Sequence, residues 1–143
     1  MSALDTNGGS IVAGGGSSSS GGVGLVPLAG YKDIDATTSP AAAPIAVGGS
    51  PIAVDPATFT GSTWTFSATG YVSSGRTATV TLYDVTAGAV AATISITATT
   101  QTAYAVSVTK PGSARVYRVL FGVDGTLNTH TAVLDGAALT IGS

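Results

Sequence analysis

The side chains that could carry acid–base or nucleophilic chemistry are few in this chain of 143 residues. It contains one histidine, no cysteine and no glutamate. His130 lies in the stretch LNTHTAV, where the pattern favours a solvent-facing strand position over a catalytic one. No G-x-S-x-G motif occurs, and the glycine-rich run GGGSSSSGGVG lacks the lysine of a phosphate loop. The sequence therefore predicts a protein that is not an enzyme.

The aspartates give little evidence for a metal or catalytic site. Asp33 and Asp35, in YKDID, would share one face of a strand and could begin a Ca²⁺ site built from oxygen ligands. No third carboxylate lies nearby in the sequence, so plain solvation or pairing with Lys32 is the alternative. Asp124 and Asp135 each precede a glycine, which is typical of turn or bulge residues. We therefore expect no metal and no other cofactor.

The charge balance argues against a polyanionic partner. Five basic residues and a net charge of −2 provide no patch that could neutralise a run of phosphates. We expect neither nucleic acid nor an anionic membrane as a partner. No stretch approaches the roughly 20 apolar residues of a membrane span, and the N-terminus lacks the features of a secretory signal. The sequence thus favours synthesis in a cytoplasm.

Residues 1–30 are predicted to form an extended N-terminal arm rich in Gly and Ser. Such a chain loses much entropy when it is ordered, so it needs contacts that offset this cost. Two small apolar islands could supply contacts with a partner: Ile11, Val12, Val23, Leu25, Val26 and Leu28. The alternative is a tail that stays disordered.

Residues 31–61 are predicted to be a connecting segment with short edge strands. Four prolines, at positions 40, 44, 51 and 56, exclude a long helix. They leave room for short strands near residues 45–47 and 52–54.

Residues 62–143 show strand alternation without any helical period, which predicts an antiparallel β-sandwich or jelly roll. The predicted fold class is thus all-β, with an extended N-terminal arm. Tyr71 and Tyr83 should face away from the Trp64 side, where they could form a platform for a sugar. The expected core consists of Trp64, Phe66, Val80, Leu82, Ile94, Tyr117, Val119 and Phe121.

Three segments resemble the small jelly-roll modules of tailed-bacteriophage virion proteins: TFSATGYVSSGRTATVTLYDVTAG, ARVYRVLFGVDG and AVLDGAALTI. The similarity covers about residues 62–142. Head decoration proteins of this kind form trimers on the capsid and use N-terminal arms to clamp neighbouring subunits. The resemblance therefore implies a homotrimer on the virion surface whose partner is the major capsid protein.

Two functions remain open at this point. The first is a capsid decoration or cement protein that stabilises the phage head and binds capsid subunits through its arm. The alternative is a fibre, spike or tail module that binds a host receptor or glycan.

Overall fold

The computed structural model describes residues 24–142, all in strands, turns and connecting loops, with no helix in that range. The predicted all-β class is confirmed. The strands are β1 (Gly24–Ala29), β2 (Lys32–Asp35), β3 (Ile45–Val54), β4 (Thr63–Val72), β5 (Ala78–Asp84), β6 (Ala89–Ile96), β7 (Thr102–Val108), β8 (Arg115–Val123) and β9 (Thr131–Gly142).

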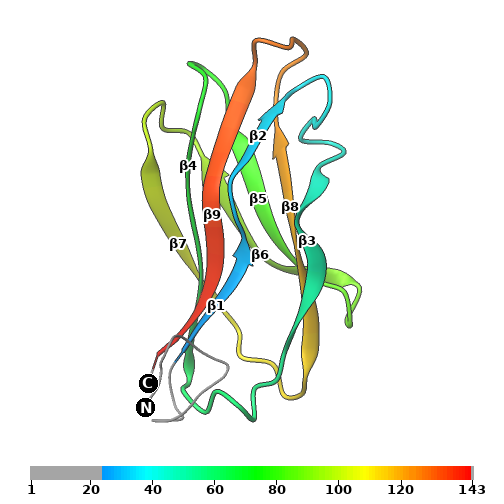
Figure 1. Ribbon diagram of the computed structural model, residues 1–143, viewed down its shortest axis with the longest axis vertical. Helices are drawn as coiled ribbons and strands as arrows, with labels where there is room; N and C mark the ends of the chain where they lie inside the picture. Colours follow the sequence, from blue (N-terminus) through cyan, green and yellow to red (C-terminus); the bar gives the residue numbers. More distant parts are fainter. Residues whose placement is uncertain (1–23, 143) are drawn as a thin grey trace.

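The strands form two antiparallel sheets that face each other (Figure 1). The first sheet has the order β1-β9-β4-β7, and β2 pairs with β9 beyond β1. The second sheet has the order β3-β8-β5-β6. Strand β9 is the longest, and it pairs with β1, β2 and β4. The first sheet therefore joins the beginning of the described chain to its end.

The core lies between the two sheets and is built from alternate residues of each strand. In β4 every second residue from Trp64 to Val72 is buried, because successive residues of a strand point to opposite faces. All of the core residues expected from the sequence are at most 2% exposed, so that prediction is confirmed. The indole nitrogen of Trp64 donates a 3.2 Å hydrogen bond to the carbonyl oxygen of Gly61, which satisfies the only polar atom of that buried ring.

Residues 24–61 belong to the sandwich, although the sequence pattern placed them in an arm and a connecting segment. Leu28 and Ile34, on β1 and β2, are each 5% exposed within the core. Strand β3 lies at the edge of the second sheet, and its pairing with β8 shifts register between Val47 and Ile52. The two short pieces expected near 45–47 and 52–54 are thus halves of one irregular edge strand.

Candidate functional site

His130 holds a loop together. Its Nδ1 atom accepts hydrogen bonds from the backbone N–H groups of Thr126, at 3.0 Å, and Leu127, at 3.2 Å. The residue is half-buried and lies just before β9, not within a strand as the sequence predicted. The tight β8–β9 connection accounts for the difference, because its backbone closes around the imidazole before the strand begins. With Nδ1 engaged in this way, the ring has a structural role.

Asp35 also stabilises a turn. Its Oδ1 accepts hydrogen bonds from the hydroxyl and the backbone N–H of Thr37, and from the backbone N–H of Thr38 at 3.1 Å. The Thr37 hydroxyl, helped by the backbone donors, holds the pKa of the Asp35 carboxyl below its ordinary value of 3.8. Among residues 24–142 no group of three or more His or Asp side chains could hold a metal ion. Asp35 and Asp33 therefore gain no further acidic ligand.

Two more aspartates hold turns at opposite ends of β5. Asp84 accepts a 2.9 Å hydrogen bond from the N–H of Ala87 and pairs with Arg115 at 3.5 Å. Asp124 accepts a 2.9 Å bond from the N–H of Thr77 and lies 3.9 Å from the guanidinium of Arg76. Both carboxylates are thereby engaged in local structure, as the turn interpretation of Asp124 predicted.

Asp135 differs from these residues. It lies at a bulge in β9: Thr69 is opposite Gly136 and Gly70 is opposite Leu134, so Asp135 has no residue of β4 facing it. The bulge predicted from the Asp-Gly pair is confirmed. Although the residue is only half-buried, its Oδ2 atom is buried and has no hydrogen-bond partner. A buried acceptor of this kind is uncommon in folded proteins.

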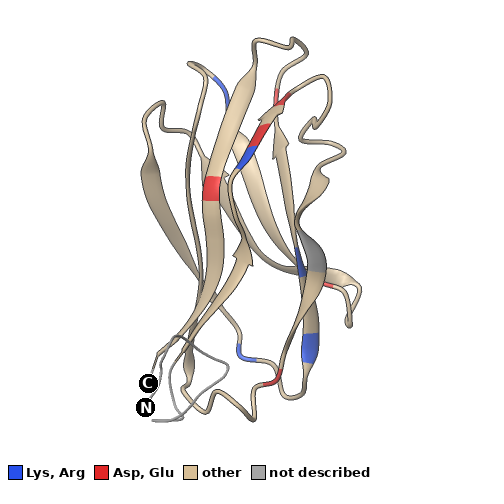
Figure 2. Cartoon of the chain, viewed as in Figure 1, with Lys and Arg blue, Asp and Glu red and all other residues tan. Residues whose placement is uncertain are grey.

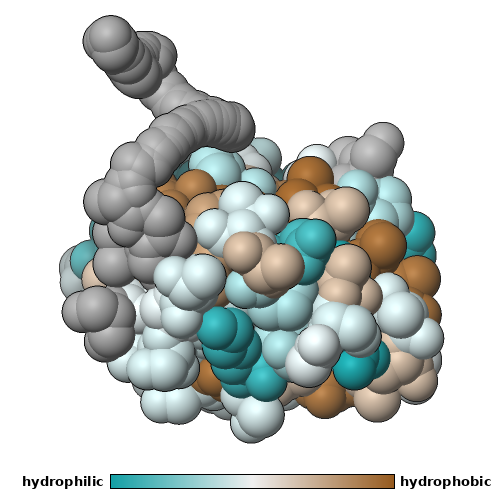
Figure 3. All heavy atoms as spheres, turned by 90° about the horizontal axis from the view of Figure 1, so that it is seen from below, coloured by the Kyte–Doolittle hydropathy of each residue, from teal (hydrophilic) through white to brown (hydrophobic). Residues whose placement is uncertain are grey.

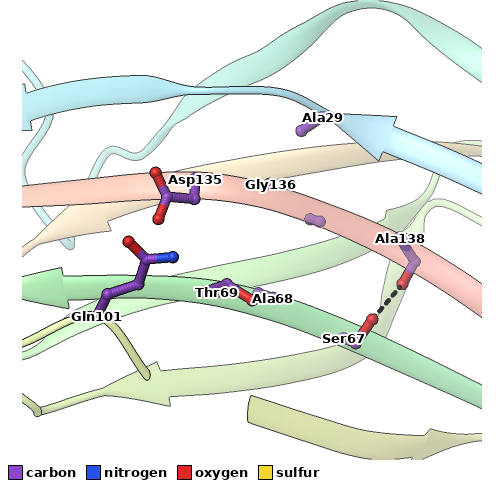
Figure 4. A pocket seen from close by; sticks show the side chains of 9 residues that line it. Ala29, Ser67, Ala68, Thr69, Gln101, Asp135, Gly136 and Ala138 are labelled. Carbon is purple, nitrogen blue, oxygen red and sulfur yellow. Dashed lines mark hydrogen bonds between the residues drawn. The ribbon is translucent and has the colours of Figure 1, made fainter. Parts of the chain in front are cut away.

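A shallow depression surrounds Asp135 on the outer face of the first sheet. It has a volume of about 400 Å³ and opens to solvent. In Figure 4 the Asp135 carboxylate and the Gln101 amide point toward one another, while Ser67 lies further along β4. The Ser67 hydroxyl donates a long 3.4 Å hydrogen bond to the carbonyl oxygen of Ala138. The remaining lining residues are Ala29, Ala68, Thr69, Gly136 and Ala137.

The tyrosines predicted to face away from the core do so, but they lie on opposite faces of the molecule. Tyr71 is half-exposed on β4 of the first sheet, and Tyr83 is half-exposed on β5 of the second. They cannot form one platform. The sequence analysis missed Tyr31, which is 66% exposed between β1 and β2. Gln101 was also missed, since a polar residue in a loop carries no signal of its own.

No protein-family model matches the sequence, and no curated protein is similar to it in sequence. Solved structures are similar in fold. The CBM36-1 domain of a multidomain xylanase from the hindgut metagenome of Trinervitermes trinervoides has a TM-score of 0.54 at 12% identity, covering 85% of this chain and 98% of that domain. The fold is a jelly-roll β-sandwich.

Two further structures match less closely. A CBM36 carbohydrate-binding module in complex with calcium and xylotriose has a TM-score of 0.48 at 16% identity, over 76% of this chain and 77% of that module. A chain of infectious bursal disease virus has a TM-score of 0.44 at 16% identity, over 99% of this chain and 38% of that one. At such identities the likeness concerns the fold alone.

The residues predicted to bind a partner fall into three groups in this jelly roll. Ile11, Val12 and Val23 lie outside the described residues. Leu28 is buried in the core of its own chain and Val26 packs against that core, because both face inward from β1. Leu25 is 63% exposed. Of the three on β1, Leu25 alone is largely exposed to solvent.

Charged residues of the jelly roll lie mainly in loops, at strand ends and on β2 (Figure 2). Strands β4, β7 and β9 carry a single charged residue, Asp135. Figure 3 shows that the end of the molecule seen from below mixes apolar and polar side chains. Residues 24–142 include no helix that could span a membrane.

Proposed function

We propose that this protein is a non-enzymatic virion structural protein, a capsid decoration or cement protein of the tailed-phage type. It is made in the host cytoplasm, forms a homotrimer and attaches to the major capsid protein at the capsid surface. The segment that precedes β1 provides the anchor. It needs no cofactor, since its function is adhesion between protein subunits.

The use of the ionisable side chains supports a non-catalytic role. His130 is held by two backbone N–H groups, and Asp84 and Asp124 each hold a turn. General acid–base catalysis requires a proton carrier within reach of a substrate. These three groups are engaged by their own chain instead.

The observation that carries the proposal is the position of β1. It is the terminal strand in the order of the first sheet, and Gly24 pairs with Ile141 near the end of β9 (Figure 1). The described chain thus begins at the edge of a sheet, with Gly24 directly before the exposed Leu25. Edge strands and the apolar side chains beside them are the usual points at which a second chain is added to a sheet.

The composition of β7, at the edge of the first sheet, suits close packing between subunits. The outward side chains of β7 are small and neutral: Ala103, Ala105 and Ser107 are all exposed. Packing the outer face of β7 against another protein desolvates no charge of that strand, so the penalty for burying ions is avoided there. The same property supports a trimer.

Deletion of residues 1–23 tests the proposal, because it leaves all nine strands in place. The truncated and full-length proteins would be sedimented with undecorated capsids of the virus that encodes the chain. We expect the deletion to abolish co-sedimentation. We expect Leu25→Asp to weaken it at least about tenfold, because one buried leucine contributes roughly 1.5–3 kcal/mol.

Leu127→Asp is the matched control. Leu127 is 54% exposed in the β8–β9 loop, at the end of the sandwich opposite the start of β1. The Leu127→Asp variant should bind capsids as well as the wild type does. Unchanged capsid affinity of the truncated protein would refute anchoring through the N-terminal segment.

A further inference from the structure

We propose that the depression at Asp135 binds a neutral saccharide through its hydroxyl groups. The capsid anchor is proposed at the start of β1, at Gly24, whereas the depression reaches only the last residue of that strand, Ala29. Asp135 on β9 is the acceptor in this proposal, Gln101 and Thr69 lie on the β4 side of the depression, and Ser67 and Ala138 lie at its other end (Figure 4). The ligand class follows from the chemistry of these groups, as set out below.

Asp135 lacks the partners that the neighbouring aspartates have. Asp35, Asp84 and Asp124 each accept at least one backbone N–H, whereas the buried Oδ2 of Asp135 accepts none. A carboxylate can accept several hydrogen bonds, and a buried one without donors is destabilising. Oδ2 has almost no accessible surface, so a rotation of the carboxylate about χ2, a soft torsion in aspartate, is needed to turn it toward the depression, where a ligand hydroxyl would supply the missing donor.

The other polar groups suit a ligand that both donates and accepts. The Gln101 amide offers two donors and one acceptor, and the hydroxyls of Thr69 and Ser67 can do either. Sugar hydroxyls have the same dual character. The depression contains no Lys or Arg that would pair with an anion, and one carboxylate is too little for a stable divalent cation site.

Small residues make up most of the lining of the site. Alanines from three strands line it, and a Cβ on Gly136 would lie 3.4 Å from the carbonyl oxygen of Ala29. The volume of about 400 Å³ falls within the usual range of small-molecule sites, about 300–1,000 Å³. Because the depression is open, it can admit one part of a longer glycan chain.

Two tyrosines lie near the depression along the chain, although neither is among the residues that line it. Tyr31 lies between Ala29, which is opposite Ala137, and Lys32, which is opposite Leu134, so it borders the bulge at Asp135. Tyr71 is two residues from Thr69 and therefore on the same face of β4. Tyrosine combines an apolar ring with a polar tip, which suits contact with the mixed surface of a sugar.

Titration of the full-length protein, followed by amide NMR shifts, tests the site. The probes are short neutral oligosaccharides of glucose, galactose, mannose and xylose, each added up to about 10 mM. We expect at least one probe to shift the amide signals of Ser67, Thr69 and Gly136. Asp135→Asn should weaken binding of that probe at least about tenfold, because a hydrogen bond to a charged acceptor is lost.

Asp33→Asn is the control, since it removes the same charge from an exposed position on β2 of the same sheet. The affinity of Asp33→Asn for the saccharide probe should equal that of the wild type. The amide spectrum of Asp135→Asn should retain the folded pattern. Deletion of residues 1–23 should leave sugar binding intact. The proposal is overturned if no probe shifts these amides, if Asp135→Asn binds as well as the wild type, or if CaCl₂ alone gives the same shifts.

Discussion

The buried hydroxyl of Ser39 donates a 2.8 Å hydrogen bond to the carbonyl oxygen of Phe121, a residue 82 positions further along the chain. The carbonyl oxygen of Ser39 in turn accepts a 3.0 Å hydrogen bond from the N–H of Val123. Ser39 has no exposed surface. Through these bonds the β2–β3 connection is fixed to the end of β8, and residues outside the regular alternation become part of the folding unit.

Replacement of Ser39 by alanine should lower the free energy of unfolding by about 1–3 kcal/mol, because the buried carbonyl of Phe121 loses a donor. Urea unfolding followed by tryptophan fluorescence would measure it. Ser113→Ala, in the exposed β7–β8 loop, should change the value by less than about 0.5 kcal/mol. Equal stability of the two variants would mean that the Ser39 bond contributes nothing.

Phe66→Ala should cost about 3–5 kcal/mol, since a fully buried ring is replaced by a cavity between the sheets. Ser107→Ala, on the outer face of the neighbouring strand β7, serves as the reference. Thermal or urea unfolding of both variants would give the difference. A loss below about 1 kcal/mol for Phe66→Ala would contradict its place in the core.

The sequence predicted the faces of β4, β5 and β8 well, because each alternates over its whole length. The prediction of which face is buried failed where the register between two paired strands shifts. In the segment AVAATISI the even-numbered positions alternate, which places Val90 on the same face as the buried Ile94 and Ile96, yet Val90 is 58% exposed. The pairing of β5 with β6 shifts between Leu82 and Tyr83, so Val90 lies opposite the outward-facing Tyr83. A single extra residue reverses the face of everything beyond it.

Pairings between distant segments could not be predicted either. The pattern in β1 is short and interrupted by Pro27, and nothing local indicates that it pairs with β9 near the other end of the chain. The candidate site at Asp135 likewise depends on pairings between segments that are distant in the sequence. Gln101 and Asp135 come together only because β7 and β9 both flank β4. The Asp-Gly pair predicted the bulge, but the missing partner of Asp135 required the three-dimensional structure.

Asp135→Ala should leave the free energy of unfolding unchanged or raise it, because the wild-type carboxylate has a buried Oδ2 without a donor. Asp84→Ala is the contrasting variant. It removes the 3.5 Å pair with Arg115 and the bond from the N–H of Ala87, and should cost about 1–3 kcal/mol. If Asp135→Ala were destabilised as much as Asp84→Ala, Asp135 would have a structural role and not one in ligand binding.

Asp35 should titrate below its ordinary value of 3.8, because donors from Thr37 and Thr38 stabilise its charged form. Since the folded pKa is depressed, its contribution to stability is complete above the unfolded pKa and is lost as the pH falls through the folded pKa. Carboxyl-carbon NMR of the folded protein would measure the value. In Thr37→Val the pKa should move back toward 3.8, and a wild-type pKa at or above 3.8 would contradict the hydrogen-bonded turn.

Cryo-electron microscopy of the native particle tests the proposed virion role most directly. We expect three copies of the jelly roll around a three-fold position on the head, each with the start of β1 toward the shell. Density from residues 1–23 should lie against the major capsid protein. Jelly-roll density on a fibre or tail, with none on the head, would contradict the decoration role, as would a purified particle without this chain.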